Sequence, residues 1–196
     1  MVKLMELVRL SAGVSQFRVS ETTDKNAECY LLYNQLDMQE DLVGIYADDS
    51  NQKRVRTLDK VSLLQEGDVI FSLISGDTTL VSEKHAGCFH TQNYIKLTPI
   101  EELDKKFLVY YINEHPKVRK HLQLGLQGSN VIKYTSKQLG DLEIADLPPI
   151  DIQRQLGELY FNQLRLRALK ERVGFSETAI VLDKLREVHC RERVTI

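Results

Sequence analysis

A polar stretch in the first third of the chain contains three cations within five residues, namely Lys53, Arg54 and Arg56. Guanidinium groups bind phosphates and can donate paired hydrogen bonds to the edge of guanine. The alternation of the two arginines with Val55 indicates that they share one face of a strand. The stretch therefore predicts a DNA-contacting strand, and an ordinary solvated surface strand is the alternative.

Two further clusters contain groups suited to DNA. One follows the Gly128 turn and offers hydroxyl, amide and ammonium groups for phosphates or base edges, and the other is a polar loop whose amides could bind adenine. The candidate residues are Ser129, Asn130, Lys133 and Tyr134 in the first cluster and Lys84 and Gln92 in the second. Each cluster is also compatible with an ordinary hydrogen-bonded loop.

No pattern of catalytic or metal-binding residues is present in the sequence. The three cysteines and five histidines have neither metal-ligand nor redox spacing, and there is no glycine-rich nucleotide loop. Asp104-Lys105-Lys106 has the composition of a metal-dependent nuclease site but lies where a helix is expected to begin. We therefore expect no catalytic residue, no metal and no cofactor, and a protein that acts by binding.

The composition predicts a globular protein without a large basic excess. The 196 residues are 42% hydrophobic and 28% charged, with a net charge of −2. Residues 1–150 contain 17 Lys and Arg against 21 Asp and Glu, and residues 151–196 contain 9 against 7. This balance argues against indiscriminate nucleic-acid binding. No apolar run approaches the roughly 18 residues of a membrane span, so we expect no membrane partner and a cytoplasmic location.

Residues 1–150 have the pattern of an α+β domain that is rich in short strands. β-branched and aromatic runs bounded by turn residues predict the strands, and a change to helical periodicity at Leu103 predicts a helix capped by Asp104 or Thr98 and interrupted at His115-Pro116. The expected strands are 2–10, 29–33, 42–46, 68–74, 79–82 and 94–98, with a last strand at 142–144.

Residues 151–196 have the pattern of one long helix that follows Pro148-Pro149. Apolar residues recur at strict seven-residue intervals, which is typical of coiled-coil pairing, whereas the companion positions three residues later are mixed. The repeated residues are Ile152, Leu159, Leu166, Val173 and Ile180. Gly174 predicts a bend or a local end. A continuous helix to Cys190 would span roughly 58 Å, so we expect a projecting helix that recruits a partner, with folding back on its own sheet as the alternative.

The order of several segments resembles one known family. These segments are EGDVIF at 66–71, FHTQNYIKLTP at 89–99, LDKKFLVYYIN at 103–113, GLQGSNVIKYTSKQL at 125–139 and LPPIDIQ at 147–153. From about residue 60 onward, their order and spacing resemble a target recognition domain and one conserved helical region of the specificity subunit of type I restriction-modification systems. The family usually has Glu-Gln after the double proline, where this chain has Ile152-Gln153.

The resemblance implies a non-catalytic subunit that reads one half of a split DNA site. A full specificity subunit has two recognition domains and two helical regions, so this chain looks like a half subunit, with residues 1–150 as the recognition domain and 151–196 as the pairing helix. The implied partners are double-stranded DNA, adenine methyltransferase subunits, a restriction subunit, and a second copy or another specificity chain. The alternative is an orphan interaction fragment that docks through its helix without reading DNA.

Overall fold

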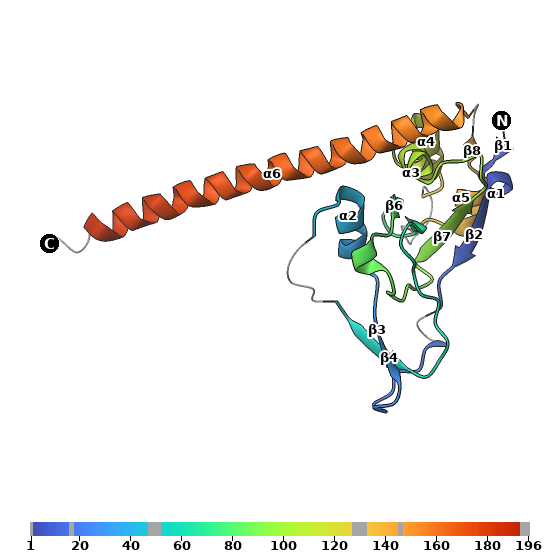
Figure 1. Cartoon of the computed structure of the whole chain (residues 1–196), viewed down its shortest axis with the longest axis horizontal. Helices are drawn as coiled ribbons and strands as arrows, with labels where there is room; N and C mark the ends of the chain where they lie inside the picture. Colours follow the sequence, from blue (N-terminus) through green and yellow to red (C-terminus); the bar gives the residue numbers. More distant parts are fainter. Residues whose placement is uncertain (1, 16–17, 47–51, 127–132, 145–146, 193–196) are drawn as a thin grey trace.

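The chain folds into a body of short strands and helices from which one long helix projects (Figure 1). The computed structural model describes residues 2–15, 18–46, 52–126, 133–144 and 147–192. Ser129 and Asn130 lie outside these ranges. No helix in the described part is long and apolar enough to cross a membrane. The expected fold class, α+β with a long C-terminal helix, is confirmed.

The body is built on an antiparallel four-stranded sheet with the strand order β2-β7-β5-β6. The strands are β2 (Val8–Ala12), β5 (Val69–Ser72), β6 (Thr78–Leu80) and β7 (Tyr94–Pro99). The central strands are apolar because both faces of the sheet are covered. Val69 and Phe71 enter the main core, while Ile70 between them enters a second core with Tyr33 and Met38.

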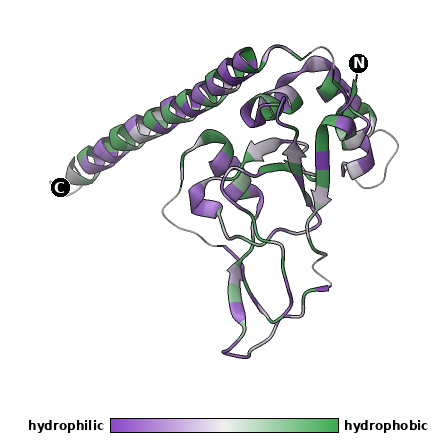
Figure 2. Cartoon of the chain, turned by 45° about the vertical axis from the view of Figure 1, so that its right-hand side comes forward, coloured by the Kyte–Doolittle hydropathy of each residue, from purple (hydrophilic) through white to green (hydrophobic). Residues whose placement is uncertain are grey.

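Two small antiparallel pairs complete the described strands. The pair β1 (Val2–Lys3) and β8 (Glu143–Ile144) brings the first residues of the chain beside the segment that precedes the long helix. The pair β3 (Glu28–Leu31) and β4 (Arg54–Thr57) forms a two-stranded ribbon. This ribbon lies on the side of the body opposite the long helix (Figures 1 and 2).

Short helices cover the sheet and link its strands. The helix α3 begins after Asp104, whose carboxylate accepts a hydrogen bond from the Phe107 amide at 2.9 Å, and it ends where Pro116 starts the next helix. The shorter elements are α1 (Leu4–Leu7), α2 (Gln35–Val43), η2 (Glu83–His85), α3 (Lys105–Glu114), α4 (Pro116–Leu124) and α5 (Ser136–Gly140).

Three local predictions were wrong. The expected strand 42–46 is instead the end of α2, which starts much earlier because Asn34 caps it and accepts hydrogen bonds from the amides of Leu36 and Asp37. The expected strand 2–10 is interrupted by one turn of helix, α1. Thr98 lies in β7 and caps no helix, so Asp104 is the cap.

The long helix α6 (Ile150–Glu192) is continuous over 43 residues, or about 64 Å. It runs through Gly174, so the predicted bend or end does not occur there. Its first half packs on α3 and α2, and its second half extends beyond the body (Figure 1). The first half thus lies on its own body, against helices and not against the sheet, and the second half projects as expected, while recruitment of a partner stays a prediction.

Two residues near the start of α6 fix its approach to α3. The buried Gln153 accepts a hydrogen bond from the Asp104 amide at 2.9 Å and donates to the carbonyls of Glu102 and Pro148 at 3.0 and 2.9 Å. One turn later, a Cβ on Gly157 would lie 2.6 Å from Lys106 Cβ and 2.7 Å from the Phe107 nitrogen. Only glycine permits this separation of the two backbones.

We predict opposite effects for two alanine substitutions in α6. Gly157→Ala should lower the free energy of unfolding by about 1–3 kcal/mol, because the added methyl overlaps the α3 backbone. Gly174→Ala is the matched control, since a Cβ added there would have no neighbour within 4 Å and alanine favours the helix by up to about 1 kcal/mol. Urea denaturation followed by circular dichroism measures both changes. Equal effects of the two substitutions would contradict this account of the α3–α6 contact.

Candidate nucleic-acid interface

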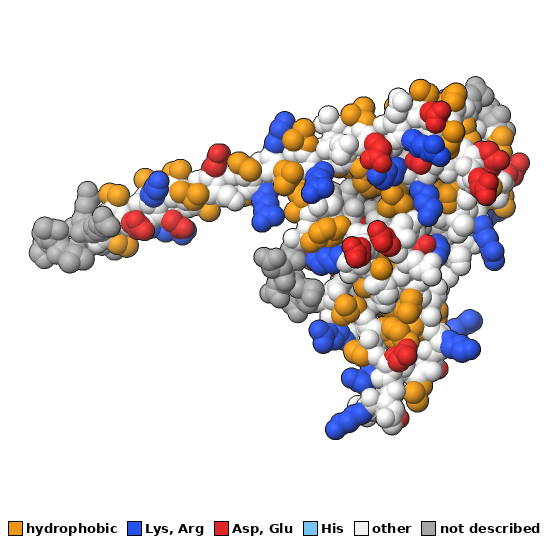
Figure 3. Space-filling model, in the orientation of Figure 1, with side chains coloured by type: hydrophobic (Ala, Val, Ile, Leu, Met, Phe, Trp, Pro, Cys, Tyr) orange, Lys and Arg blue, Asp and Glu red, His pale blue; other side chains and the backbone are white. Residues whose placement is uncertain are grey.

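The β3–β4 ribbon holds the three cations predicted at 53–56. Its register pairs Cys29 with Arg56 and Leu31 with Arg54. Val55 is buried, whereas Arg54 is exposed and Arg56 is half-buried. Figure 3 shows that Lys and Arg side chains gather around this end of the body. The predicted alternation of the strand is therefore present.

The three cations differ in their contacts. The Arg56 guanidinium donates hydrogen bonds to the carbonyls of Ala27 at 2.9 Å and Lys25 at 3.3 Å, so it closes the loop before β3. Lys53 forms an exposed ion pair with Glu21 at 2.9 Å, which contributes little free energy in water. Among the described residues, the Arg54 guanidinium forms no hydrogen bond or ion pair. Arg54 is thus the ribbon cation whose donors are available to a ligand.

Lys84 belongs to a cluster of charged groups between η2 and α2. Its ammonium group lies 2.9 Å from Glu40 Oε2, and the neighbouring His85 is buried with its Nδ1 2.7 Å from Asp41 Oδ1. His85 Nε2 faces the carboxylate of Asp37 at 3.7 Å, and burial raises the pKa of Asp37. In this structure Lys84 therefore helps to hold η2 on α2.

Lys133 contacts the turn that contains Gln92, at one end of the central sheet. Gln92 is exposed on the turn before β7, and the Lys133 ammonium donates a hydrogen bond to Asn93 Oδ1 at 2.6 Å. Tyr134 is only 7% exposed, and its ring packs edge-on against Phe71 in the main core. Gln92 and Lys133 therefore offer polar surface, whereas Tyr134 serves the packing of the body.

The predicted DNA-contacting residues thus form separate groups. Lys53, Arg54 and Arg56 lie at the ribbon, Gln92 lies on the turn before β7 that Lys133 contacts through Asn93, and Lys84 lies on η2. In the part of the chain that the structure describes, no group of three or more His, Cys, Asp or Glu side chains is placed to hold a metal ion. The arrangement places hydrogen-bond donors on a projecting ribbon, where they can bind a ligand.

The seven-residue stripe of α6 lies on the surface along its whole length. Its members are exposed by 43 to 58% even where the helix packs on the body. The exposed members are Ile152, Leu159, Leu166, Val173 and Ile180. The body is contacted by other residues of α6, including Leu156, Tyr160 and Leu164. The stripe is therefore available to a second helix.

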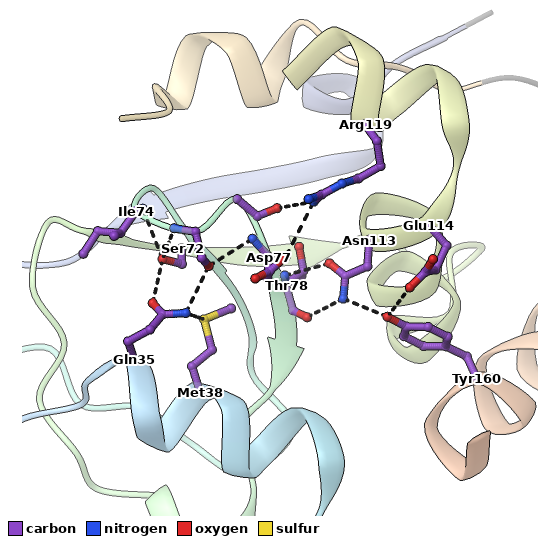
Figure 4. A network of polar contacts seen from close by, with 12 residues as sticks. Gln35, Met38, Ser72, Ile74, Asp77, Thr78, Asn113, Glu114, Arg119 and Tyr160 are labelled. Carbon is purple, nitrogen blue, oxygen red and sulfur yellow. Dashed lines mark hydrogen bonds and ion pairs between the residues drawn. The ribbon is translucent and has the colours of Figure 1, made fainter. Parts of the chain in front are cut away.

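The sequence did not indicate a polar network that joins α6 to the sheet (Figure 4). Asn113 in α3 exchanges hydrogen bonds with the backbone of Thr78 at 2.8 and 2.9 Å and donates to the Tyr160 hydroxyl at 3.3 Å. The Tyr160 hydroxyl donates to Glu114 at 3.0 Å, and burial raises the pKa of Tyr160. Arg119 bonds the Gly76 carbonyl at 2.8 Å. The contacts of Asn113 and Tyr160 link α6 to α3 and β6. The contact of Arg119 links α4 to the turn between β5 and β6.

Comparisons with solved structures identify proteins of the same fold. The HsdS subunit from Thermoanaerobacter tengcongensis matches with a TM-score of 0.59 and 21% identity over 94% of this chain. A chain from a type I R-M system, studied for complex assembly and conformational transition, matches with a TM-score of 0.59 and 19% identity. The S subunit of the type I restriction-modification system of M. genitalium matches with 0.53 and 13%. No family model and no curated protein sequence matches the chain.

The resemblance stated from the sequence is confirmed at the level of the fold. The three matches each cover 94% of this chain but only 41 to 43% of the specificity subunits. This chain therefore has the fold of somewhat less than half of such a subunit, including a body and one long helix.

We predict that the two ribbon arginines differ in their effect on stability. Arg56→Ala should lower the free energy of unfolding by about 1–3 kcal/mol, because the Ala27 and Lys25 carbonyls lose a charged donor. Arg54→Ala should change it by less than about 0.5 kcal/mol. Urea denaturation measures both. A destabilising Arg54→Ala would show that Arg54 also has a structural role.

Proposed function

We propose that this chain is a half-length specificity subunit that acts in the cytoplasm in a type I restriction-modification complex. Residues 1–150 read one half of a bipartite DNA site, and residues 151–196 pair with a second specificity chain. The chain selects DNA, while adenine methylation and cleavage belong to the methyltransferase and restriction subunits.

The observation that carries this proposal is the coverage of the structural matches. Nearly the whole chain aligns with less than half of each specificity subunit. A protein with two such halves could be assembled from two short chains instead of one long chain. The exposed stripe on α6 supports this assembly, because five large apolar residues on one helix face favour burial against another helix.

The ribbon is the element that we assign to base recognition. The DNA major groove is wide enough for a two-stranded β-ribbon, and β3–β4 projects from the body on the side away from α6 (Figures 1 and 2). Arg54 is exposed on it with its donors available in the described structure. Lys53 can exchange its exposed pairing with Glu21 for a phosphate. Gln92, Lys133, Lys84, Ser129 and Asn130 remain candidates for further contacts.

The spacing of the stripe favours antiparallel pairing of two copies. The stripe is symmetric about Leu166, so an antiparallel pair centred there places Ile152 level with Ile180 and Leu159 level with Val173. The two bodies then lie at opposite ends of the helix pair. A two-fold dimer of this kind would read an inverted-repeat site with two equal halves.

We predict that the chain determines which adenines are methylated. Co-production with its methyltransferase subunits should give methylation at one split sequence, mapped by single-molecule sequencing of genomic DNA. Arg54→Ala should relax or abolish recognition of one base pair in each half, because a bidentate contact contributes about 1–3 kcal/mol of discrimination. Lys170→Ala, an exposed change on α6, is the control. An unchanged methylation pattern with and without the chain would instead support the orphan interaction fragment.

We predict that a cysteine pair in the stripe reports antiparallel pairing. In a Cys29→Ser, Cys190→Ser background, which removes the two exposed cysteines, Ile152→Cys with Ile180→Cys should form a disulfide-linked dimer under mild oxidation. Neither single variant should form the antiparallel link. Leu159→Asp with Leu166→Asp should make the chain monomeric in sedimentation velocity without unfolding the body. Efficient linkage by Ile152→Cys alone would indicate parallel pairing.

A further inference from the structure

The loop that precedes β3, residues 22–27, forms the end of the ribbon farthest from α6 (Figure 1). Both ends of this loop are tied to Arg56 of β4. The Thr22 amide donates a hydrogen bond to the Arg56 carbonyl at 2.9 Å, and the Arg56 guanidinium donates to the carbonyls of Lys25 and Ala27. Because these bonds hold the loop in shape, a ligand contact made from it loses little conformational entropy.

Two side chains of this loop, those of Lys25 and Asn26, are exposed. The Asn26 backbone amide donates to Asp24 Oδ1 at 2.9 Å, whereas its side-chain amide forms no hydrogen bond with any described residue. The Lys25 ammonium likewise has no hydrogen bond or ion pair within the described structure. An asparagine amide can pair with N6 and N7 of adenine in the major groove, and a lysine ammonium can bind a phosphate. The loop thus offers one group for a base and one for the DNA backbone.

The charges around the end of the ribbon favour a polyanionic ligand. Residues 18–31 and 52–62 contain six Lys and Arg against four Asp and Glu, although residues 1–150 contain 17 against 21. The four carboxylates have internal partners, which are Lys53 for Glu21, the Asn26 backbone amide for Asp24, the Tyr30 hydroxyl for Glu28 and the Ser20 backbone amide for Asp59. The cations whose side chains bond no described residue are Arg18, Lys25, Arg54 and Lys60. The local field is therefore positive in a body that is acidic overall.

We propose that residues 22–27 are a second DNA-reading segment, in which Asn26 contacts an adenine and Lys25 binds a phosphate of the same duplex. The inference rests on the proposed function, because it adds contacts to the same recognition surface. Arg54 pairs with Leu31 at one end of β3, and the loop joins the other end, so about 10 Å, or roughly three base-pair steps, separates them. A ribbon in the major groove would bring both to bases of one half-site.

The phosphate contact is tested by the salt dependence of DNA binding. The full-length chain is titrated into a fluorescein-labelled 30-base-pair duplex at several salt concentrations, and the slope of log K against log salt reports the number of phosphates neutralised. Lys25→Ala should make this slope shallower by about one. Lys120→Ala removes an exposed lysine on α4, away from the ribbon, and should leave the slope unchanged. An unchanged slope in Lys25→Ala overturns the phosphate contact.

The base contact is tested by mapping methylated adenines in cells that produce the chain with its methyltransferase subunits. Asn26→Ala should lower discrimination at one A·T pair of the half-site at least about fivefold, and Arg54→Ala should relax a different pair. Gln123→Ala, which removes an exposed amide from α4, should leave the site unchanged. Urea denaturation should give the same free energy of unfolding with and without the Asn26 side chain, since that side chain bonds no described residue.

The outcomes separate this inference from the function on which it rests. If the chain directs methylation and Arg54→Ala alters the site, but Lys25→Ala and Asn26→Ala behave like the α4 controls, the loop assignment is wrong and the proposed function stands. If the chain neither binds the duplex nor changes the methylation pattern, the proposed function fails and the loop assignment fails with it. A shallower slope in Lys25→Ala, together with relaxation of an A·T pair in Asn26→Ala, supports the inference.

Discussion

The close contact between α6 and α3 is the constraint on which the rest of the structure depends. Gln153 forms hydrogen bonds with three backbone groups near the start of both helices. Gly157 lets the backbones of α6 and α3 lie closer together than a Cβ at that position would allow. The Tyr160 and Asn113 hydrogen bond continues this contact toward the sheet. Because these contacts fix one end of a rigid 43-residue helix, they also determine where the stripe and the second half of α6 lie relative to the ribbon.

Features specified by local sequence were predicted, and features that depend on distant neighbours were not. The long helix follows from its own periodicity, and Asp104, one of the two caps that the sequence offered for α3, accepts a hydrogen bond from an amide only three residues later. The helix α2 was missed because it buries Asp37, Glu40 and Asp41, which a sequence pattern assigns to solvent. Those carboxylates are tolerated in the interior because Lys84 and His85, more than 40 residues away, contact them.

In the candidate site, too, the sequence predicted which residue types are present but not which of their side chains are available to a ligand. The sequence identified Arg54 and Arg56 as equivalent, because alternation places both on one face of a strand. The structure distinguishes them, since Arg56 faces the carbonyls of the loop before β3 while Arg54 extends from the ribbon. Tyr134 likewise has the composition of a DNA contact, yet its ring fills space against Phe71. Which polar groups remain available depends on loops that residue types do not specify.

Charged and apolar surfaces lie on different parts of the chain, with cations on the β3–β4 ribbon and the exposed apolar stripe on α6. An acidic body with a few cations on a projecting ribbon provides little general attraction to DNA, so under the proposed function selectivity comes from geometry. In the proposed dimer, selective binding at two half-sites requires that the two bodies be held rigidly with respect to each other. A long helix anchored by buried polar contacts at one end, with an exposed apolar stripe along its length, meets that requirement, because the proposed pairing would fix the spacing between the two ribbons. Under the proposed function, flexibility at Gln153 or Gly157 would therefore weaken recognition at both half-sites, although both residues lie in the α3–α6 contact and not on the ribbon.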